Sequence, residues 1–166
     1  GLGDVYKRQA YEGAGLADHA AGVYSLMTVA SVREFSGMGM YLGFACALLV
    51  AFALIHAHAD VDADTLLLAG LLLAAGLPLI LPQMNARSLY LAGMLAFACA
   101  GSARRLAIAG MLELISLCSY MEAIFNCTII PMNVLSLMAI ACATVILLEL
   151  LDKLGIKGAL SRESNA

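Results

Sequence analysis

One arginine, in a turn between two apolar segments, is the residue of this chain best placed to do chemistry at a membrane surface. Arg87 lies within LPQMNARSLYLAGMLAFACA, where a Pro-containing helix end, a polar turn and another apolar helix are expected in that order. A guanidinium at an outer membrane boundary binds phosphate or carboxylate through charge-assisted hydrogen bonds. The alternative is that Arg87 snorkels to lipid headgroups. Asn85 and Tyr90 lie beside it in the sequence.

A second candidate is a carboxylate inside an apolar segment. Glu113 is expected within a membrane span, where an ionised carboxylate is costly unless it is paired or hydrated. At helical spacing Glu113, Ser116 and Tyr120 share one face and predict a polar stripe toward the bundle interior. The stripe is either a substrate or proton pathway, or a protonated or hydrogen-bonded packing surface. Glu122 falls on the opposite face and is expected to be a solvated boundary residue.

Metal and disulfide chemistry are not expected. His56, His58 and three aspartates occupy every second position from 56 to 64. No cysteine or second histidine pair completes a ligand set, so a solvated juxtamembrane loop is favoured. The five cysteines form no C-x-x-C pair and are scattered through apolar runs. They are expected to be small buried side chains rather than disulfides or ligands.

Composition decides what surrounds these residues. Hydrophobic residues make up 63% of the 166 residues and charged residues 13%, against roughly 45–50% and 25% in soluble domains. So few charges cannot cover a soluble surface, and the bilayer is the alternative solvent. The net charge of -3 and the lack of a basic patch give no reason to expect nucleic acid.

Charge-free intervals predict an all-α fold, a polytopic transmembrane bundle of about five membrane helices. Spanning takes ~20 apolar residues, and the runs lack the alternation of barrel strands. The expected helices cover residues 37–56, 65–81, 88–103, 106–125 and 130–151. The third is short for a full span. Gly39-x-x-x-Gly43 permits close helix packing, although it does not indicate which helices meet.

The distribution of Lys and Arg predicts the orientation. Arg104 and Arg105 follow the third helix, and Lys153 follows the fifth, so both places fall on one side, expected to be cytoplasmic. The turn at Pro82–Arg87 then lies outside. Outside the bundle of residues 37–151, we expect a non-native sequencing remnant at 1–9, an extramembrane or interfacial segment at 10–36, and a cytoplasmic tail at 152–166.

The segment around Arg87 resembles a signature of a known family. It is similar to the P-x-M-H-E-R-Y-x-Y-L-A motif of bacterial mannosyltransferases related to the GPI-anchor mannosyltransferases, which are multi-spanning glycosyltransferases of the GT-C class. The matching positions are Pro82, Met84, Arg87, Tyr90, Leu91 and Ala92. The later stretch LISLCSYMEAIF and the earlier DHAAGVYSL also resemble family segments, and the likeness extends over about Gly15–Leu151.

The resemblance implies transfer of a hexose, expected to be mannose, from a polyprenyl-phosphate donor at the outer face of a bacterial plasma membrane. Arg87 would contact the donor phosphate, with Asn85 and Tyr90 beside it; the acceptor, a glycan or a lipid, is open, and no other cofactor is implied. Asn85, Ala86 and Ser88 replace the family's His, Glu and Tyr, so this copy is expected to be altered or inactive. The catalytic carboxylate is expected upstream, in an early external loop. A transporter or flippase-like bundle with Glu113 in its pathway, and a non-catalytic membrane subunit, are the alternatives.

Overall fold

The computed structural model describes residues 23, 32–57, 61–82, 84, 86–125 and 129–155, and for 32–36, 86 and 87 the backbone alone. This part of the chain is helical and contains no strand. Its helices are α2 (Val32–Ile55), α3 (Ala63–Ile80), the 3-10 helix η2 (Ala86–Leu89), α4 (Tyr90–Ala98), α5 (Ala103–Phe125) and α6 (Met132–Lys153). Four of them, α2, α3, α5 and α6, are long and apolar enough to cross a membrane. The predicted all-α membrane bundle with one short helix is therefore confirmed.

Local chemistry explains where the helices begin and end. The Asp62 carboxylate caps α3 by accepting the Thr65 N–H at 2.8 Å and the Thr65 hydroxyl at 2.5 Å. These two hydrogen bonds hold the pKa of the Asp62 carboxyl below its usual range. Pro131, which has no N–H to leave unsatisfied, precedes α6. At the other end of α6, Gly155 takes the left-handed conformation that commonly stops a helix.

The third predicted helix is the one whose bounds were wrong. The charge-free interval predicted a helix over residues 88–103, but α4 ends at Ala98 and is preceded by one 3-10 turn. The chain turns at Cys99 and Gly101, where the Gly101 N–H donates to the Cys99 carbonyl at 2.7 Å. Together η2 and α4 rise about 22 Å, well short of a hydrocarbon core of ~30 Å.

The other predicted spans agree with the observed helices to within a few residues at most ends. The largest difference is at α2, which begins at Val32 and so extends five residues before the predicted start at 37. The apolar window that could cross a membrane still begins at Gly37. Most of the expected extramembrane or interfacial segment at 10–36 lies outside the described residues.

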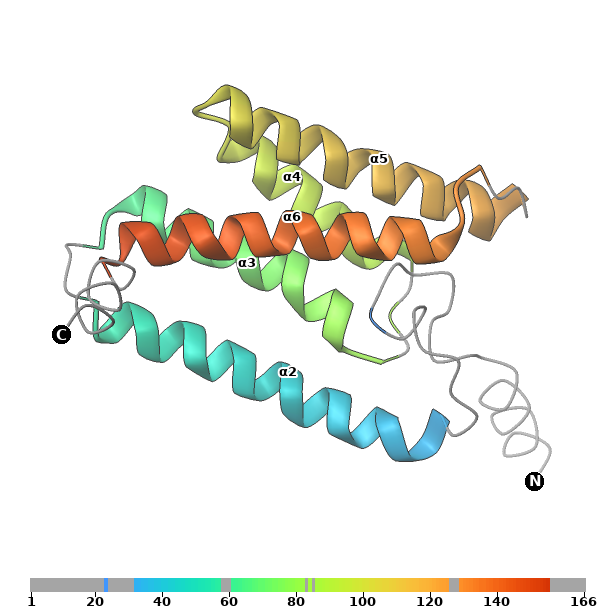
Figure 1. Cartoon of the computed structure of the whole chain (residues 1–166), viewed down its shortest axis with the longest axis horizontal. Helices are drawn as coiled ribbons and strands as arrows, with labels where there is room; N and C mark the ends of the chain where they lie inside the picture. Colours follow the sequence, from blue (N-terminus) through green and yellow to red (C-terminus); the bar gives the residue numbers. More distant parts are fainter. Residues whose placement is uncertain are drawn as a thin grey trace, which may run out of the picture.

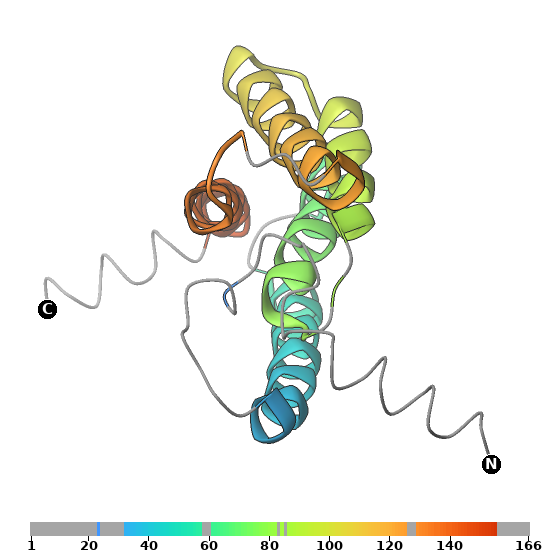
Figure 2. The ribbon, with the colours of Figure 1, turned by 90° about the vertical axis from the view of Figure 1, so that its right-hand side faces the viewer.

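α3 is the helix around which the others pack. It contacts α2, α4, η2 and α6, whereas α2 packs on α3 and on no other described helix. Viewed along the helices, α6 stands to one side of a column that runs from α2 through α3 to α4 and α5 (Figure 2). Figure 1 shows α2 and α5 as the outer helices of this arrangement. Contacts of α4 and α6 with α5 complete the bundle.

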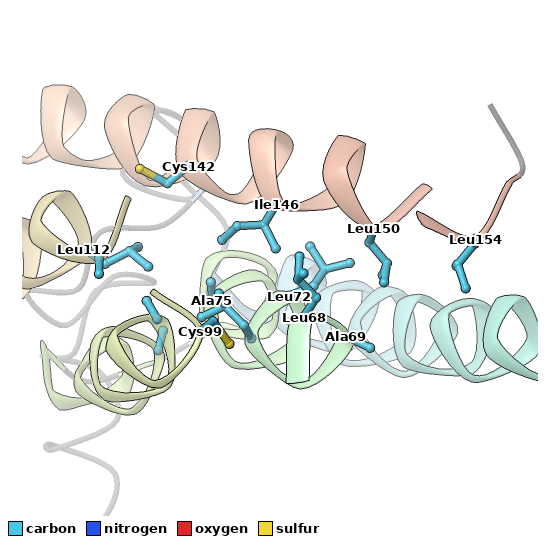
Figure 3. Packing of buried hydrophobic residues seen from close by; sticks show 14 residues of the cluster. Leu68, Ala69, Leu72, Ala75, Cys99, Leu112, Cys142, Ile146, Leu150 and Leu154 are labelled. Atoms are coloured by element: carbon cyan, nitrogen blue, oxygen red, sulfur yellow. The ribbon is translucent and has the colours of Figure 1, made fainter. Parts of the chain in front are cut away.

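The interior is built from leucine and isoleucine set among small residues. Ile146 and Leu150 of α6 point toward Leu68 and Leu72 of α3 (Figure 3), and all four are buried. Alanines of α3 and α4 and the buried Cys99 and Cys142 fill the remaining space. Small side chains let membrane helices approach closely, which matters because lipid provides no hydrophobic drive for their association.

The glycine motif in α2 lies at the contact with α3. Gly39 and Gly43 are buried, and a Cβ atom added at Gly43 would lie 3.0 Å from Leu81 Cδ2 and 3.7 Å from Leu77 Cδ2. The structure thus answers what the motif alone left open: its second glycine lets α2 approach the end of α3.

We expect Gly43→Leu to loosen the α2–α3 contact and to lower the free energy of unfolding by about 1–3 kcal/mol, because the added side chain overlaps Leu81. Gly37→Leu is the matched control, since a Cβ there meets nothing within 4 Å. Thermal or denaturant unfolding in detergent micelles measures both variants. Equal stability of the two would contradict the assigned contact.

Candidate functional site

The turn that carries Arg87 is fixed at both ends by backbone and packing. Leu81 leaves α3 with ψ near 133°, in the extended conformation favoured before a proline, here Pro82. Its N–H still donates to the Leu77 carbonyl at 2.8 Å. At the end of η2, the buried Leu89 packs in one cluster with Ile115 and Cys118 of α5 and with residues of α6. The turn is therefore pinned to the bundle through Leu89.

The three residues proposed from sequence to bind substrate fall in or beside this turn. Arg87 is in η2, and its side chain lies outside the described part of the structure, as does all of Asn85. Tyr90 is the first residue of α4, and its side chain is 52% exposed on the outside of the bundle. The backbone therefore keeps Arg87 and Tyr90 one helical turn apart, while their contact with a common ligand stays a prediction.

The proposed polar stripe on α5 is partly enclosed by the neighbouring helix α4. Ser116 is buried, and Glu113 and Tyr120 are half-buried. Glu113 lies against Gly93 of α4, so closely that a Cβ at Gly93 would come within 2.2 Å of Glu113 Oε1. The carboxylate thus occupies the contact between α4 and α5, an arrangement consistent with the packing interpretation.

Glu122 is less exposed than a solvated boundary residue would be. Its side chain is half-buried and its Oε2 atom is fully buried. Glu122 lies one helical turn beyond Cys118, which packs with Leu89. α5 therefore brings this carboxylate toward the end of the bundle that carries η2.

The opposite end of the bundle holds a charge cluster that the sequence did not reveal. The Arg105 guanidinium donates from Nη1 and Nη2 to the two Asp64 carboxylate oxygens at 2.7 and 2.9 Å, and from Nε to Glu149 at 2.6 Å. Lys153 Nζ also binds Asp64 and lies 3.8 Å from Asp62 Oδ2. These five residues, called the charge cluster below, join the start of α3, the start of α5 and the end of α6.

Burial makes the cluster more than a surface ion pair. The Arg105 side chain is 14% exposed and that of Glu149 21%, against 38% for Asp64. Isolated exposed pairs contribute about 0–1 kcal/mol, but a two-pronged arginine–carboxylate pair with limited solvent access is stronger. The distribution of Lys and Arg along the sequence predicts that Arg105 and Lys153 lie on one side of the membrane. That distribution predicts no partner for the aspartates. The cluster could have been predicted from the opposite charges that stand at the ends of three spans.

The His/Asp segment forms no metal centre within the described residues, where no group of three potential ligands comes together. His56 stacks on Phe52 with ring centroids 4.0 Å apart and its Nδ1 lies 3.2 Å from the Phe52 carbonyl. His58 and Asp60 lie outside the described part of the chain.

Four spanning helices, with α3 at their centre, and a fifth, shorter helix that begins at an irregular turn define an integral membrane helix bundle. Comparison of the chain with protein-family models, with curated proteins and with solved structures gives no match. The chain is therefore established as an integral membrane protein of the helix-bundle class.

We expect Arg105→Ala to lower the free energy of unfolding by about 2–3 kcal/mol, somewhat less than the 3–5 kcal/mol for breaking a fully buried pair, because Asp64 remains partly solvated. Arg104→Ala, at the exposed neighbouring position, should change it little. Unfolding in detergent micelles compares the two, and an equal effect would contradict a specific role for Arg105.

Proposed function

We propose that this bundle is the carboxy-terminal membrane region of a GT-C-type glycosyltransferase that uses a polyprenyl-phosphate-linked hexose. The observation that carries the proposal is the irregular turn with Arg87, the residue that stands at the arginine of the family motif. Non-helical backbone at membrane depth is tolerated where protein buries it or where it lines a polar site. Such a turn, held in place by Leu89, is a suitable support for an anion-binding arginine.

The depth of the turn supports phosphate binding. Leu89 belongs to the same buried cluster as Ile115 and Cys118, and α5 continues from Cys118 to Phe125, about 10 Å further along its axis. The turn is thus set back from the end of α5 and is not at the tip of the bundle. An arginine at that level would meet a lipid-linked phosphate at the boundary between headgroups and hydrocarbon, where water competes less for its hydrogen bonds.

We propose that a carboxylate of α5 takes the place of the one that the turn lacks in sequence. Ala86 stands where the family has a glutamate, so the turn itself has no acid to orient Arg87. Glu122 of α5 approaches the same end of the bundle, with one oxygen buried. We therefore assign Glu122 to the surroundings of the proposed site, as an acid that could orient the bound groups. We assign the role of general base to none of the described residues.

The orientation that goes with this proposal puts the turn outside and the charge cluster inside. The support is that Arg105 and Lys153, which set the positive side, contact the same Asp64 and so share one end of the bundle. η2 lies away from that end, beyond the second half of α3. The membrane would be a bacterial plasma membrane.

A reporter fused after residue 153 should therefore behave as cytoplasmic. We expect a fused green fluorescent protein to be fluorescent and a fused alkaline phosphatase to be inactive, because the latter folds only after export. The same reporters fused after Pro82 should give the reverse pattern. The opposite result at both positions would invert the proposed orientation.

We expect Arg87→Ala to weaken binding of polyprenyl phosphate by about 10- to 100-fold, since a charge-assisted hydrogen bond contributes ~1.5–3 kcal/mol. Binding is measured by titrating the chain in nanodiscs with polyprenyl phosphate, and Arg104→Ala is the control. In the intact enzyme the same change should abolish sugar transfer and leave membrane insertion unchanged. Unaltered binding and transfer would remove Arg87 from the site.

A further inference from the structure

A separate apolar groove runs between α2, α3 and α6, on the side of the bundle away from α5. Its volume is about 410 Å³. It is lined by Val23, by Cys46, Leu49 and Val50 of α2, by Leu72, Leu73, Gly76, Leu77, Leu79 and Ile80 of α3, and by Ile140, Ala143, Thr144 and Leu147 of α6.

The groove offers an occupant no polar partner. Among the described residues of its wall, Thr144 carries the only hydroxyl, and that hydroxyl already donates to the Ile140 carbonyl at 2.8 Å. The half-buried Cys46 thiol is at most a weak hydrogen-bond group. Because the other described lining residues are aliphatic or glycine, these walls hold an occupant by van der Waals contact.

The groove opens sideways, into the plane of the membrane. α2 and α6 both pack on α3, and the two have no packing contact with each other. Figure 2 shows α6 and α2 on separate sides of α3. All three helices are candidate spans, so the opening between them faces hydrocarbon rather than water.

The groove leaves open space beside Gly76 of α3. A Cβ added at Gly76 would meet nothing within 4 Å, whereas the same atom at Gly43 would touch Leu81 at 3.0 Å. Gly76 therefore forms part of the floor of the groove and does not serve a close contact between helices. Its role there is to leave room.

We infer that this groove holds one acyl chain of a membrane phospholipid. Its α3 wall from Leu72 to Ile80 is about 12 Å long, close to the ~15 Å of one leaflet. A long polyprenyl chain exceeds one leaflet. The inference stands independently of the proposed function.

The test uses the whole chain in nanodiscs made with a phospholipid that carries a photoreactive diazirine on its acyl chain. Illumination should label the groove walls, above all residues 46–50 and 140–147. Gly76→Phe should reduce that labelling at least about fivefold, because the ring occupies the floor of the groove. Gly70→Phe is the matched control: a Cβ at Gly70 also meets nothing within 4 Å, but Gly70 does not line the groove.

Ala143→Phe, on the α6 wall, gives a second variant should Gly76→Phe fail to fold, and it should reduce labelling in the same way. Equal labelling of the wild type and of the folded groove variant would overturn the inference. Displacement of the label by a few mole per cent of polyprenyl phosphate would overturn it in favour of an isoprenoid chain. Disulfide cross-linking between copies at Thr144→Cys would overturn it in favour of a helix contact.

Discussion

The guanidinium of Arg105 binds carboxylates from two other helices, and the rest of the bundle is arranged around that attachment. Asp64 begins α3 and Glu149 lies near the end of α6, so one side chain fixes three of the spanning helices at the same end. Lys153 adds a second cation to Asp64. In a membrane interior, where apolar surface gives little preference for one packing over another, such directional bonds select a single arrangement of helices.

From this attachment, α3 runs to the opposite side of the membrane and carries the packing with it. Its leucines meet α6, its alanines lie in the same buried cluster as those of α4, and Leu77 and Leu81 at its end meet Gly43 of α2. Beyond Pro82 the chain does not return across the bundle as a full-length helix. It re-enters the bundle through η2 and the short α4. The proposed substrate-binding turn is thus the place where the chain reverses direction between α3 and α4. It lies at the end of the bundle remote from the charge cluster.

The sequence predicts the spans because charges and prolines mark their ends: Asp62 precedes α3, and Pro131 precedes α6. It does not predict the early end of α4. No charge interrupts the apolar run before Arg104, and the turn at Gly101 depends on how α4 and α5 meet. The pairing of Arg105 with Asp64, 41 residues apart, is equally hidden, because loop charges give the side of the membrane but not which helices are neighbours. For Arg87, the sequence gives the motif and the structure gives the backbone of its turn.

The attachment of α2 has a consequence for motion. α2 contacts the described bundle through α3 alone, and its backbone hydrogen bonds are internal to the helix, as in any membrane span. Swinging α2 away from α3 therefore breaks the side-chain packing at Gly43 and at Val50, Ala53 and Leu54, and leaves the backbone hydrogen bonds of both helices intact. Because α2 also forms one wall of the acyl-chain groove, the width of that groove is set by the least restrained helix. Lateral fluctuations of α2 would admit or release a lipid chain while the three helices joined by Arg105 stay in place.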